Sequence, residues 1–481
     1  MARTAPDGAA TSRAASQAAS PSAYRTILAL ACAAQFMVVL YVSVVNVALP
    51  SIQASLDFTD TGLPWVAGAY SLTFAGFLLP GGRLADLYGT RLVFAAGLAL
   101  FSVPSLAGGL ATAPALLIAA RAVQGLGAAV LAPATLTVLT TTFPEGPRRT
   151  RALAVWTAVS LAGGAAGNLV GGVLTESLSW RWILLVNVPI GAAALGMARF
   201  LPGSARGAPP AARPDLPGAA AATTGLALLA YGIMRAGPHG WGDTWTASAL
   251  AAAILLLAAF VLIETRPARD PLIPPRLLRL RAVSAGNMVM LLAGACFQVP
   301  MWYFLTLSMQ DVLGYSALRT GLGFLPHTLL TMAVGLRVTP WLVRRAGHRT
   351  LVAAGALVAA AGFLWQSRIT AGGDYVSAVL GPAVLVSVGG GLLNTPLTAI
   401  VTSGVAGSDA GAASGLANTA KQVGGALGLA VLTTATAGGG ATRPALADSY
   451  GDAFLIMAFL SAAIAAAALA LPPGRGAAGP S

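Results

Sequence analysis

Three ionisable side chains lie deep within long apolar stretches of this 481-residue chain, and all three are basic: Arg121, Lys421 and His327. A buried arginine costs roughly 2.5–3.5 kcal/mol at the centre of a membrane helix on insertion scales, so Arg121 should face a protein interior and contact partners there. Histidine titrates near physiological pH, which makes His327 a candidate proton carrier. The alternative for His327 is a plain hydrogen bond within the bundle. The fifteen acidic residues all fall in tails, loops or segment ends.

The composition of the chain requires a membrane. Hydrophobic residues make up 56% and charged residues only 9%, whereas a soluble domain carries about 25% charged residues. The net charge of +13 is spread over many short loops, which argues against nucleic-acid binding. Cys32 and Cys296 lie far apart in different apolar segments, so no disulfide framework is expected. No clustered acids, histidines or nucleophile indicate an enzyme, and we expect neither a metal site nor a cofactor.

Stretches long enough to cross a membrane, each of roughly 20 apolar residues, recur along the chain. Fourteen are predicted, at about 26–49, 63–81, 91–111, 114–141, 151–175, 182–201, 218–236, 245–264, 283–309, 318–343, 349–369, 376–401, 411–437 and 452–472. Arginine placement orients them, because cytoplasmic loops carry an excess of Lys and Arg. With the amino terminus inside, 20 of the 28 basic residues are cytoplasmic and five lie outside. Both termini are therefore predicted to be cytoplasmic.

This count divides the chain into two six-helix bundles. They span residues 25–201 and 283–472, with linker helices 7 and 8 and cytoplasmic loops at 202–282, a disordered cytoplasmic tail at 1–24 and a cytoplasmic tail at 473–481. A shift of 258 residues places 84–91 on 342–349 and keeps a leucine, a glycine and an arginine. Two parallel halves with an inserted helix pair are expected to produce such a repeat.

A short polar stretch between the second and third segments has the pattern G-x-L-A-D-x-x-G-x-R. It contains Gly82, Asp86, Gly89 and Arg91. The glycines permit a sharp turn, and Asp86 can meet the positive end of a helix dipole or an arginine at the membrane surface. The pattern resembles the loop between helices 2 and 3 of major facilitator superfamily transporters, where it implies a conformational role.

Two other runs resemble motifs of that superfamily. The first contains Arg121, Gln124 and Gly125, and the second contains Gly163, Gly167 and Gly171. The first resembles the helix-4 motif, which is tied in the superfamily to coupling or conformational exchange. The second resembles the antiporter motif, and its glycines four residues apart form a flat stripe that lets helices approach closely. That stripe serves either static packing or a sliding contact between the halves.

Further motifs narrow the resemblance. Residues 45–50 read V-N-V-A-L-P, 179–182 S-W-R-W, 187–191 N-V-P-I-G, 240–242 G-W-G and 421–428 K-Q-V-G-G-A-L-G. Together they look like the fourteen-helix drug:proton antiporter family, which includes many actinobacterial antibiotic exporters. The resemblance implies an all-α integral membrane protein with the major facilitator fold. It also implies export of drug-like molecules across a bacterial plasma membrane by alternating access, with the proton gradient as energy source.

Two positions depart from that family. Asn168 stands where the antiporter motif usually has proline. Tyr41 stands where the family usually has an aspartate, which is thought to exchange protons and to meet cationic drugs. Tyrosine titrates only near pH ~10, so Tyr41 cannot carry protons on and off near neutrality.

A mixture of polar and aromatic residues near mid-membrane suits an amphipathic organic solute. The candidate substrate-binding residues are Gln35, Tyr41, Asn46, Asn168, Gln298, Trp302, Phe324, Asn394, Asn418, Lys421 and Gln422. The expected partners are therefore a small organic solute and the lipid bilayer, and the chain is expected to be a monomer. The rival functions are an uptake or facilitative carrier for a metabolite, anionic in view of the basic interior, and a non-transporting membrane scaffold.

Overall fold

The computed structural model describes residues 21–201, 215–265, 275–405, 409–438, 440 and 442–472, and these residues form helices and no strands. The α-helices are α1 (Pro21–Leu56), α2 (Trp65–Tyr88), α3 (Thr90–Gly109), α4 (Pro114–Thr142), α5 (Pro147–Ser177), α6 (Trp182–Leu185), α7 (Asn187–Met197), α8 (Leu216–His239), α9 (Thr244–Glu264), α10 (Pro275–Leu278), α11 (Arg281–Phe297), α12 (Pro300–Leu307), α13 (Ala317–Gly323), α14 (Leu325–Ala333), α15 (Thr339–Ala346), α16 (His348–Gln366), α17 (Gly381–Val401), α18 (Ala410–Ala435) and α19 (Arg443–Ala468). Short 3₁₀ or π turns extend several of them: η1 (Ala198–Phe200), η2 (Ser308–Val312), η3 (Val334–Val338) and η4 (Val376–Leu380).

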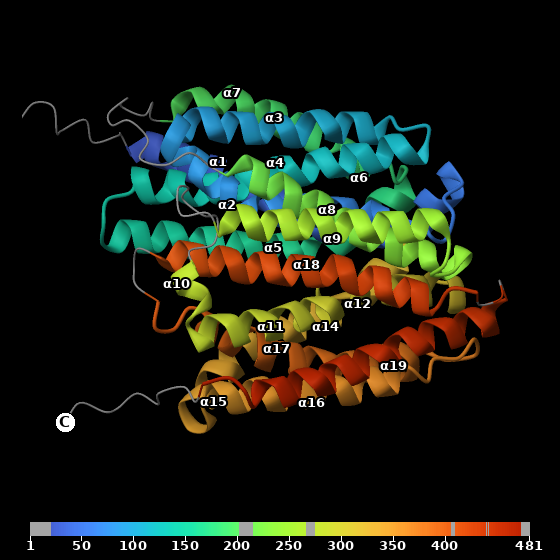
Figure 1. Cartoon of the computed structure of the whole chain (residues 1–481). Helices are drawn as coiled ribbons and strands as arrows, with labels where there is room; N and C mark the ends of the chain where they lie inside the picture. The colour runs from blue at the N-terminus through green and yellow to red at the C-terminus, as the bar shows by residue number, and fades with distance from the viewer. Residues whose placement is uncertain are drawn as a thin grey trace, which may run out of the picture.

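The long helices lie side by side along one direction (Figure 1). We call the end where α1 begins and α19 ends the terminal end, and the other the opposite end. Helices α1 to α7 pack into one bundle and α11 to α19 into another. Each of the fourteen predicted segments overlaps a helix, and the all-helical fold class is confirmed, whereas the count of fourteen membrane spans stays a prediction.

Twelve helical runs among the described residues are long and apolar enough to cross a membrane, which makes the chain a multi-pass membrane protein. Two of the predicted segments correspond to α2 and α18, which are 24 and 26 residues long but are not among these twelve. Both contain several glycines and hydroxyl residues, and α18 also carries Lys421. The last segment begins earlier than predicted, at Arg443, because Asp448 and Asp452 lowered the apolarity of its first turns.

Helices α8 and α9 form a hairpin against both bundles. Asp215 and Asp243 cap their amino-terminal ends by accepting hydrogen bonds from the backbone N–H groups of Gly218 and Thr246, as side chains at helix starts commonly do. Helix α8 contacts α2 of one bundle and α18 of the other. The Thr434 hydroxyl donates to the Ile233 carbonyl, which fixes α18 to α8. The hairpin therefore covers one seam between the bundles.

The 258-residue repeat predicted from the sequence extends to backbone geometry. Gly89 precedes α3 with φ 88°, and Gly347 precedes α16 with φ 77°. Gly146 and Gly404, again 258 residues apart, also have positive φ, a region that glycine occupies without steric cost. Such matching turns are expected for parallel transporter repeats.

Close helix packing follows the same repeat. A Cβ atom on Gly97 would lie 3.0 Å from the Leu131 nitrogen, and one on Gly355 would lie 2.7 Å from the Gly389 oxygen. Each residue of the second pair stands 258 positions after its counterpart in the first. Glycine at these positions lets α3 pack on α4 and α16 on α17 at backbone contact distance.

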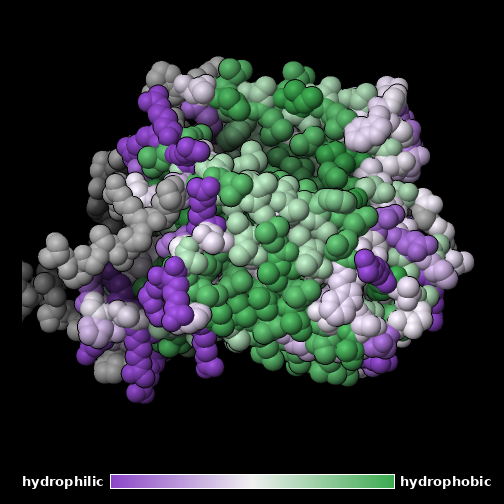
Figure 2. Space-filling model, turned by 90° about the horizontal axis from the view of Figure 1, so that it is seen from below, coloured by the Kyte–Doolittle hydropathy of each residue, from purple (hydrophilic) through white to green (hydrophobic). Residues whose placement is uncertain are grey.

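An apolar belt lies between two polar ends on the face shown in Figure 2. Exposed large apolar side chains populate α9 in particular, where Ile254 is 65% and Leu255 is 70% exposed. A soluble protein rarely exposes a continuous apolar surface of this kind. The belt is the surface expected to contact lipid.

Candidate transport pathway

A buried polar network joins α1, α2, α3 and α4. The Tyr41 hydroxyl donates to Gln124 Oε1 at 2.5 Å, and Gln124 Nε2 donates to the Ser105 hydroxyl at 2.6 Å. Arg121 Nε donates to the Val66 carbonyl at 2.6 Å. No carboxylate contacts Arg121 among the described residues, although this arginine is only 2% exposed.

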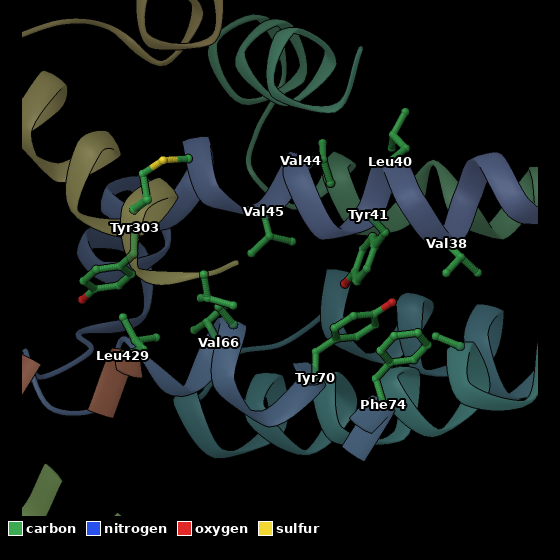
Figure 3. Close-up of a cluster of buried hydrophobic side chains, with 14 of the residues drawn as sticks. Val38, Leu40, Tyr41, Val44, Val45, Val66, Tyr70, Phe74, Tyr303 and Leu429 are labelled. Atoms are coloured by element: carbon green, nitrogen blue, oxygen red, sulfur yellow. The ribbon is translucent and has the colours of Figure 1, made fainter. Parts of the chain in front are cut away.

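Two tyrosine rings contact the guanidinium group of Arg121. Its guanidinium carbon lies 4.4 Å from the centre of the Tyr41 ring and 4.6 Å from that of Tyr70. The side chains of Tyr41 and Tyr70 point toward one another from α1 and α2 (Figure 3). Aromatic faces attract a desolvated cation, so these rings help to hold the charge inside the bundle.

The helix-4 motif is tightly packed against α2. A Cβ atom on Gly125 would lie 2.1 Å from the Thr73 hydroxyl oxygen and 2.4 Å from the Tyr70 carbonyl oxygen. The Thr73 hydroxyl also donates to the Ala122 carbonyl at 2.8 Å. Glycine at position 125 is therefore required for the close contact that brings Tyr70 next to Arg121.

An aromatic cluster with a histidine occupies the second bundle. Trp302 lies 5.1 Å from Phe324 and 5.0 Å from His327, measured between ring centres. His327 Nδ1 and the Ser387 hydroxyl oxygen are 2.8 Å apart and hydrogen-bonded. His327 thus has the intrabundle hydrogen bond that the sequence allowed as its alternative role, and proton transfer by it stays a prediction.

The two bundles meet at the opposite end. Gln310 Nε2 donates to the Val47 carbonyl at 2.8 Å, and the backbone N–H of Leu318 donates to Glu176 Oε2 at 2.8 Å. A Cβ atom on Gly321 would lie 2.5 Å from the Asn168 carbonyl oxygen. These contacts join α1 and α5 to η2 and α13.

Apolar side chains complete this closure. Val45 and Val66 come from the first bundle, and Tyr303 and Leu429 come from the second. All four are at most 5% exposed and belong to one buried cluster (Figure 3). Buried apolar side chains from both bundles therefore fill the interface at this level.

The interior face of α18 is open toward the terminal end. Gly411, Ser414 and Asn418 on this face are exposed and Lys421 is half-buried, whereas Leu429, two turns further on, is buried. A neighbouring stripe contacts α2, because the Thr419 hydroxyl donates to the Ala75 carbonyl. Exposure along this face of α18 thus falls from Gly411 at the terminal end to Leu429, as in a pathway open on one side.

The candidate substrate-binding residues separate by accessibility. Gln35, Tyr41, Asn46, Asn168, Phe324 and Gln422 are buried, Gln298, Trp302, Asn394 and Lys421 are half-buried, and Asn418 is exposed. Gln35 accepts a hydrogen bond from Thr135 across α1 and α4. In this conformation a solute can reach only the half-buried and exposed members.

The candidate conformational residues occupy three places. Gly89 and Arg91 lie at the α2–α3 turn at the terminal end, Arg121, Gln124 and Gly125 in the buried network, and Gly163, Gly167 and Gly171 against α1. The prediction that Gly82 also permits the turn is wrong, because Gly82 lies inside α2 and the positive φ of the turn belongs to Gly89. The placement of the Asp86 side chain lies outside the described residues. Gly163, Gly167 and Gly171 contact α1 within the same bundle, whereas a Cβ atom on the adjacent Gly172 would lie 2.7 Å from the Ala317 carbonyl oxygen in the other bundle.

Sequence reasoning missed Asp311, which lies in η2 inside the helical run Arg281–Val312. Its carboxylate accepts a hydrogen bond from the Tyr450 hydroxyl at 3.2 Å. It also follows Gln310, the residue that bridges the bundles. The segment predicted from the sequence ends at residue 309, two residues before Asp311. A segment that ended at Val312, as the helical run does, would have included it.

Known proteins resemble this chain in sequence and in fold. Residues 31–429 match the Major Facilitator Superfamily. The cephamycin export protein CmcT of Amycolatopsis lactamdurans is 57% identical over 93% of this chain and 94% of its own length. The puromycin resistance protein pur8 of Streptomyces alboniger is 41% identical over 86% and 82%, respectively.

Solved structures support the fold alone. The POT family transporter PepTSo superimposes with a TM-score of 0.68 at 14% identity, over 94% of this chain and 97% of its own. A D-xylose-proton symporter superimposes with a TM-score of 0.64 at 12% identity, over 94% and 99%.

The family match, together with relatives that are export and resistance proteins, makes this two-bundle chain a membrane transporter, not an enzyme. The chain belongs to the Major Facilitator Superfamily, as the sequence motifs predicted, and its relatives include actinobacterial antibiotic export and resistance proteins.

Proposed function

We propose that this protein exports amphipathic, antibiotic-like organic molecules across a bacterial plasma membrane by alternating access. The observation that carries the proposal is its 57% identity, over nearly its full length, to a cephamycin export protein. Relatives that confer resistance to puromycin and tetracenomycin C support the same class of substrate. An interior helix face of graded exposure supplies a route along which such a molecule can enter.

The proposed topology has fourteen spans, with the terminal end in the cytoplasm and the protein a monomer. Helices α2 and α18, at 24 and 26 residues, are about 36–39 Å long and exceed the ~30 Å hydrocarbon core. Their lower apolarity fits helices that line an interior between the bundles. The arginine excess in loops at the terminal end supports its cytoplasmic orientation. In this orientation, the described conformation is open to the cytoplasm.

Proton flow is the proposed energy source, because each charge crossing ~100 mV yields about 2.3 kcal/mol. With tyrosine at position 41, another group has to bind the proton. Asp311 is our candidate, since it is a half-buried carboxylate beside the Gln310 bridge that joins the two bundles. A proton on Asp311 would alter charge next to that bridge, so protonation and opening would be linked. His327 is the second candidate.

The test is drug accumulation in an efflux-deficient bacterium that expresses the protein. Cells are exposed to a cephamycin, puromycin and tetracenomycin C, and accumulation is measured with and without a protonophore. Asp86→Asn at matched abundance serves as the expected inactive control. We expect lower accumulation of at least one compound, reversed by the protonophore. Unchanged accumulation of all three would contradict the export proposal, and increased accumulation would favour the uptake alternative.

A further inference from the structure

Lys421 is the single lysine of the chain, and the other 27 basic residues are all arginine. It stands near the middle of α18, with eleven residues of the helix before it and fourteen after it in the range Ala410–Ala435. Arginine presents a planar fork, whereas lysine is a compact and strongly hydrated point charge on a flexible stem. Lys421 therefore differs in chemistry from every other basic residue of the chain.

The direction of Lys421 follows from the contacts of its helix. Gly411, Ser414, Asn418 and Lys421 recur every three or four residues, so they share one face of α18. This face lies between the side that packs on α2 through Thr419 and the side that packs closely on α11 through Gly424 and Gly428. Helix α8, which packs on the lipid-facing α9, contacts another side of α18, where the Thr434 hydroxyl donates to the Ile233 carbonyl. Lys421 therefore faces the space between the bundles.

The deep end of this face is closed just beyond Lys421. A Cβ atom on Gly425, one turn further along, would lie 3.1 Å from Gln298 Cβ. Leu429, the next residue of the face, is 1% exposed and belongs to the buried cluster at the opposite end. A solute entering from the terminal end along α18 passes Asn418 and then meets the ammonium group.

Lys421 has no ion pair and no side-chain hydrogen bond with any residue that the structure describes. Arg121, the other deep cation, differs because a backbone carbonyl, Gln124 and two aromatic rings contact it. A charge at mid-membrane depth without a partner is unfavourable. An anionic group arriving from outside the protein would supply the missing counter-charge.

We propose that Lys421 binds the carboxylate of the transported molecule, with the Asn418 amide as an additional donor on the same face. The preferred substrates are then amphipathic carboxylates that carry one anionic group on an aromatic or alicyclic body. Trp302, half-buried in the second bundle, offers an aromatic surface for that body. This inference rests on the proposed export function, because it names the residue that contacts the anionic group of the exported molecule.

The first test compares two fluorescent probes that differ in one group: 7-diethylaminocoumarin-3-carboxylate and the corresponding carboxamide. Their dissociation constants are measured with the purified full-length protein in nanodiscs. We expect wild type to bind the carboxylate about tenfold more tightly than the carboxamide, the scale of one charge-assisted hydrogen bond. Lys421→Met should remove this difference without weakening carboxamide binding, and Lys421→Arg should retain it. Equal binding of both probes to wild type, or no carboxylate binding, would overturn the proposal.

The second test uses the uniqueness of the lysine and does not depend on a variant that folds. Reductive methylation with ¹³C-formaldehyde labels Lys421 and the terminal amino group, which serves as an internal control. Saturating carboxylate probe should shift the lysine methyl resonance and leave the terminal resonance in place. Equal shifts with carboxylate and carboxamide would contradict the proposal. Because both tests measure binding, a specific carboxylate site without export in cells would reject the export function and retain the site.

Discussion

The Tyr41 hydroxyl donates a hydrogen bond to Gln124 Oε1 in the interior of the first bundle. This bond places a neutral ring at the position where the resembled antiporters usually have an aspartate. The same ring lies under the Arg121 guanidinium, so aromatic faces and neutral acceptors surround that cation. Among the described residues of the first bundle, no carboxylate offsets the positive charge of Arg121. This charge disfavours permanent cations as substrates.

We predict that Tyr41→Asp raises export of a cationic dye relative to a neutral one. One added carboxylate contributes about 1 kcal/mol to the interaction with a cation, so the expected increase is about fivefold. Export of the cation should also become more dependent on pH. The measurement is dye export from proteoliposomes with an imposed pH gradient.

Tyr41→Phe is the matched control, because it keeps the ring over Arg121 and removes only the hydroxyl bonded to Gln124. It should leave the ratio of cationic to neutral export unchanged. Strong proton-driven export of the cationic dye by the unaltered protein would contradict this account of Tyr41.

A second prediction concerns the proton. Asp311→Asn keeps an acceptor for the Tyr450 hydroxyl but cannot bind a proton as a carboxylate does. If Asp311 couples transport to protons, uphill export driven by a pH gradient should fall about tenfold or more, since each proton supplies about 2.3 kcal/mol at ~100 mV. Exchange of labelled for unlabelled solute without a gradient should persist. The two activities are compared in the same proteoliposomes.

Tyr450→Phe removes the hydroxyl donor and leaves the Asp311 carboxylate, so gradient-driven export should largely survive in it. Full gradient-driven export by Asp311→Asn would exclude this carboxylate and direct attention to His327.

The fold was largely predictable because it depends on local patterns. Apolar segments of sufficient length predicted the helices, and the repeated glycine at positions 89 and 347 marked equivalent turns. The less apolar α2 and α18 were found by the same pattern, although they line the interior and do not meet the hydropathy of the other spans.

The candidate site was less predictable because it depends on contacts between distant segments. The Gln310 bond to the Val47 carbonyl joins residues 263 positions apart and has no sequence pattern. The inclusion of Asp311 in a span depends on a π turn that extends the helix beyond its apolar residues. The arginine at 121 was recognised, but its aromatic partners on two other helices could not be inferred from spacing.

The third prediction tests the repeated turn. Gly89 and Gly347 have φ and ψ values of 88° and 140° and of 77° and 162°, a region that costs a non-glycine residue about 1–3 kcal/mol. Gly89→Ala and Gly347→Ala should each lower the apparent melting temperature of the purified protein, measured by intrinsic fluorescence. Gly82→Ala is the control, because its Cβ would lie 3.8 Å from Pro133 Cβ, an ordinary contact. Equal melting temperatures for all three variants would mean that the turns tolerate a side chain.

The fourth prediction tests the orientation of the bundle. Glu145, with a side chain 89% exposed, lies between α4 and α5 at the terminal end, and Gly242 lies exposed between α8 and α9 at the opposite end. A Cβ atom on Gly242 would meet nothing within 4 Å, so cysteine fits there without strain. Single cysteines at these two positions are introduced after replacing Cys32 and Cys296, both buried, with alanine. If the terminal end is cytoplasmic, a membrane-impermeant thiol reagent should label Gly242→Cys in intact cells and Glu145→Cys only after permeabilisation. The reverse pattern would place the open end of the pathway outside the cell, and the described conformation would then be the one that faces outward.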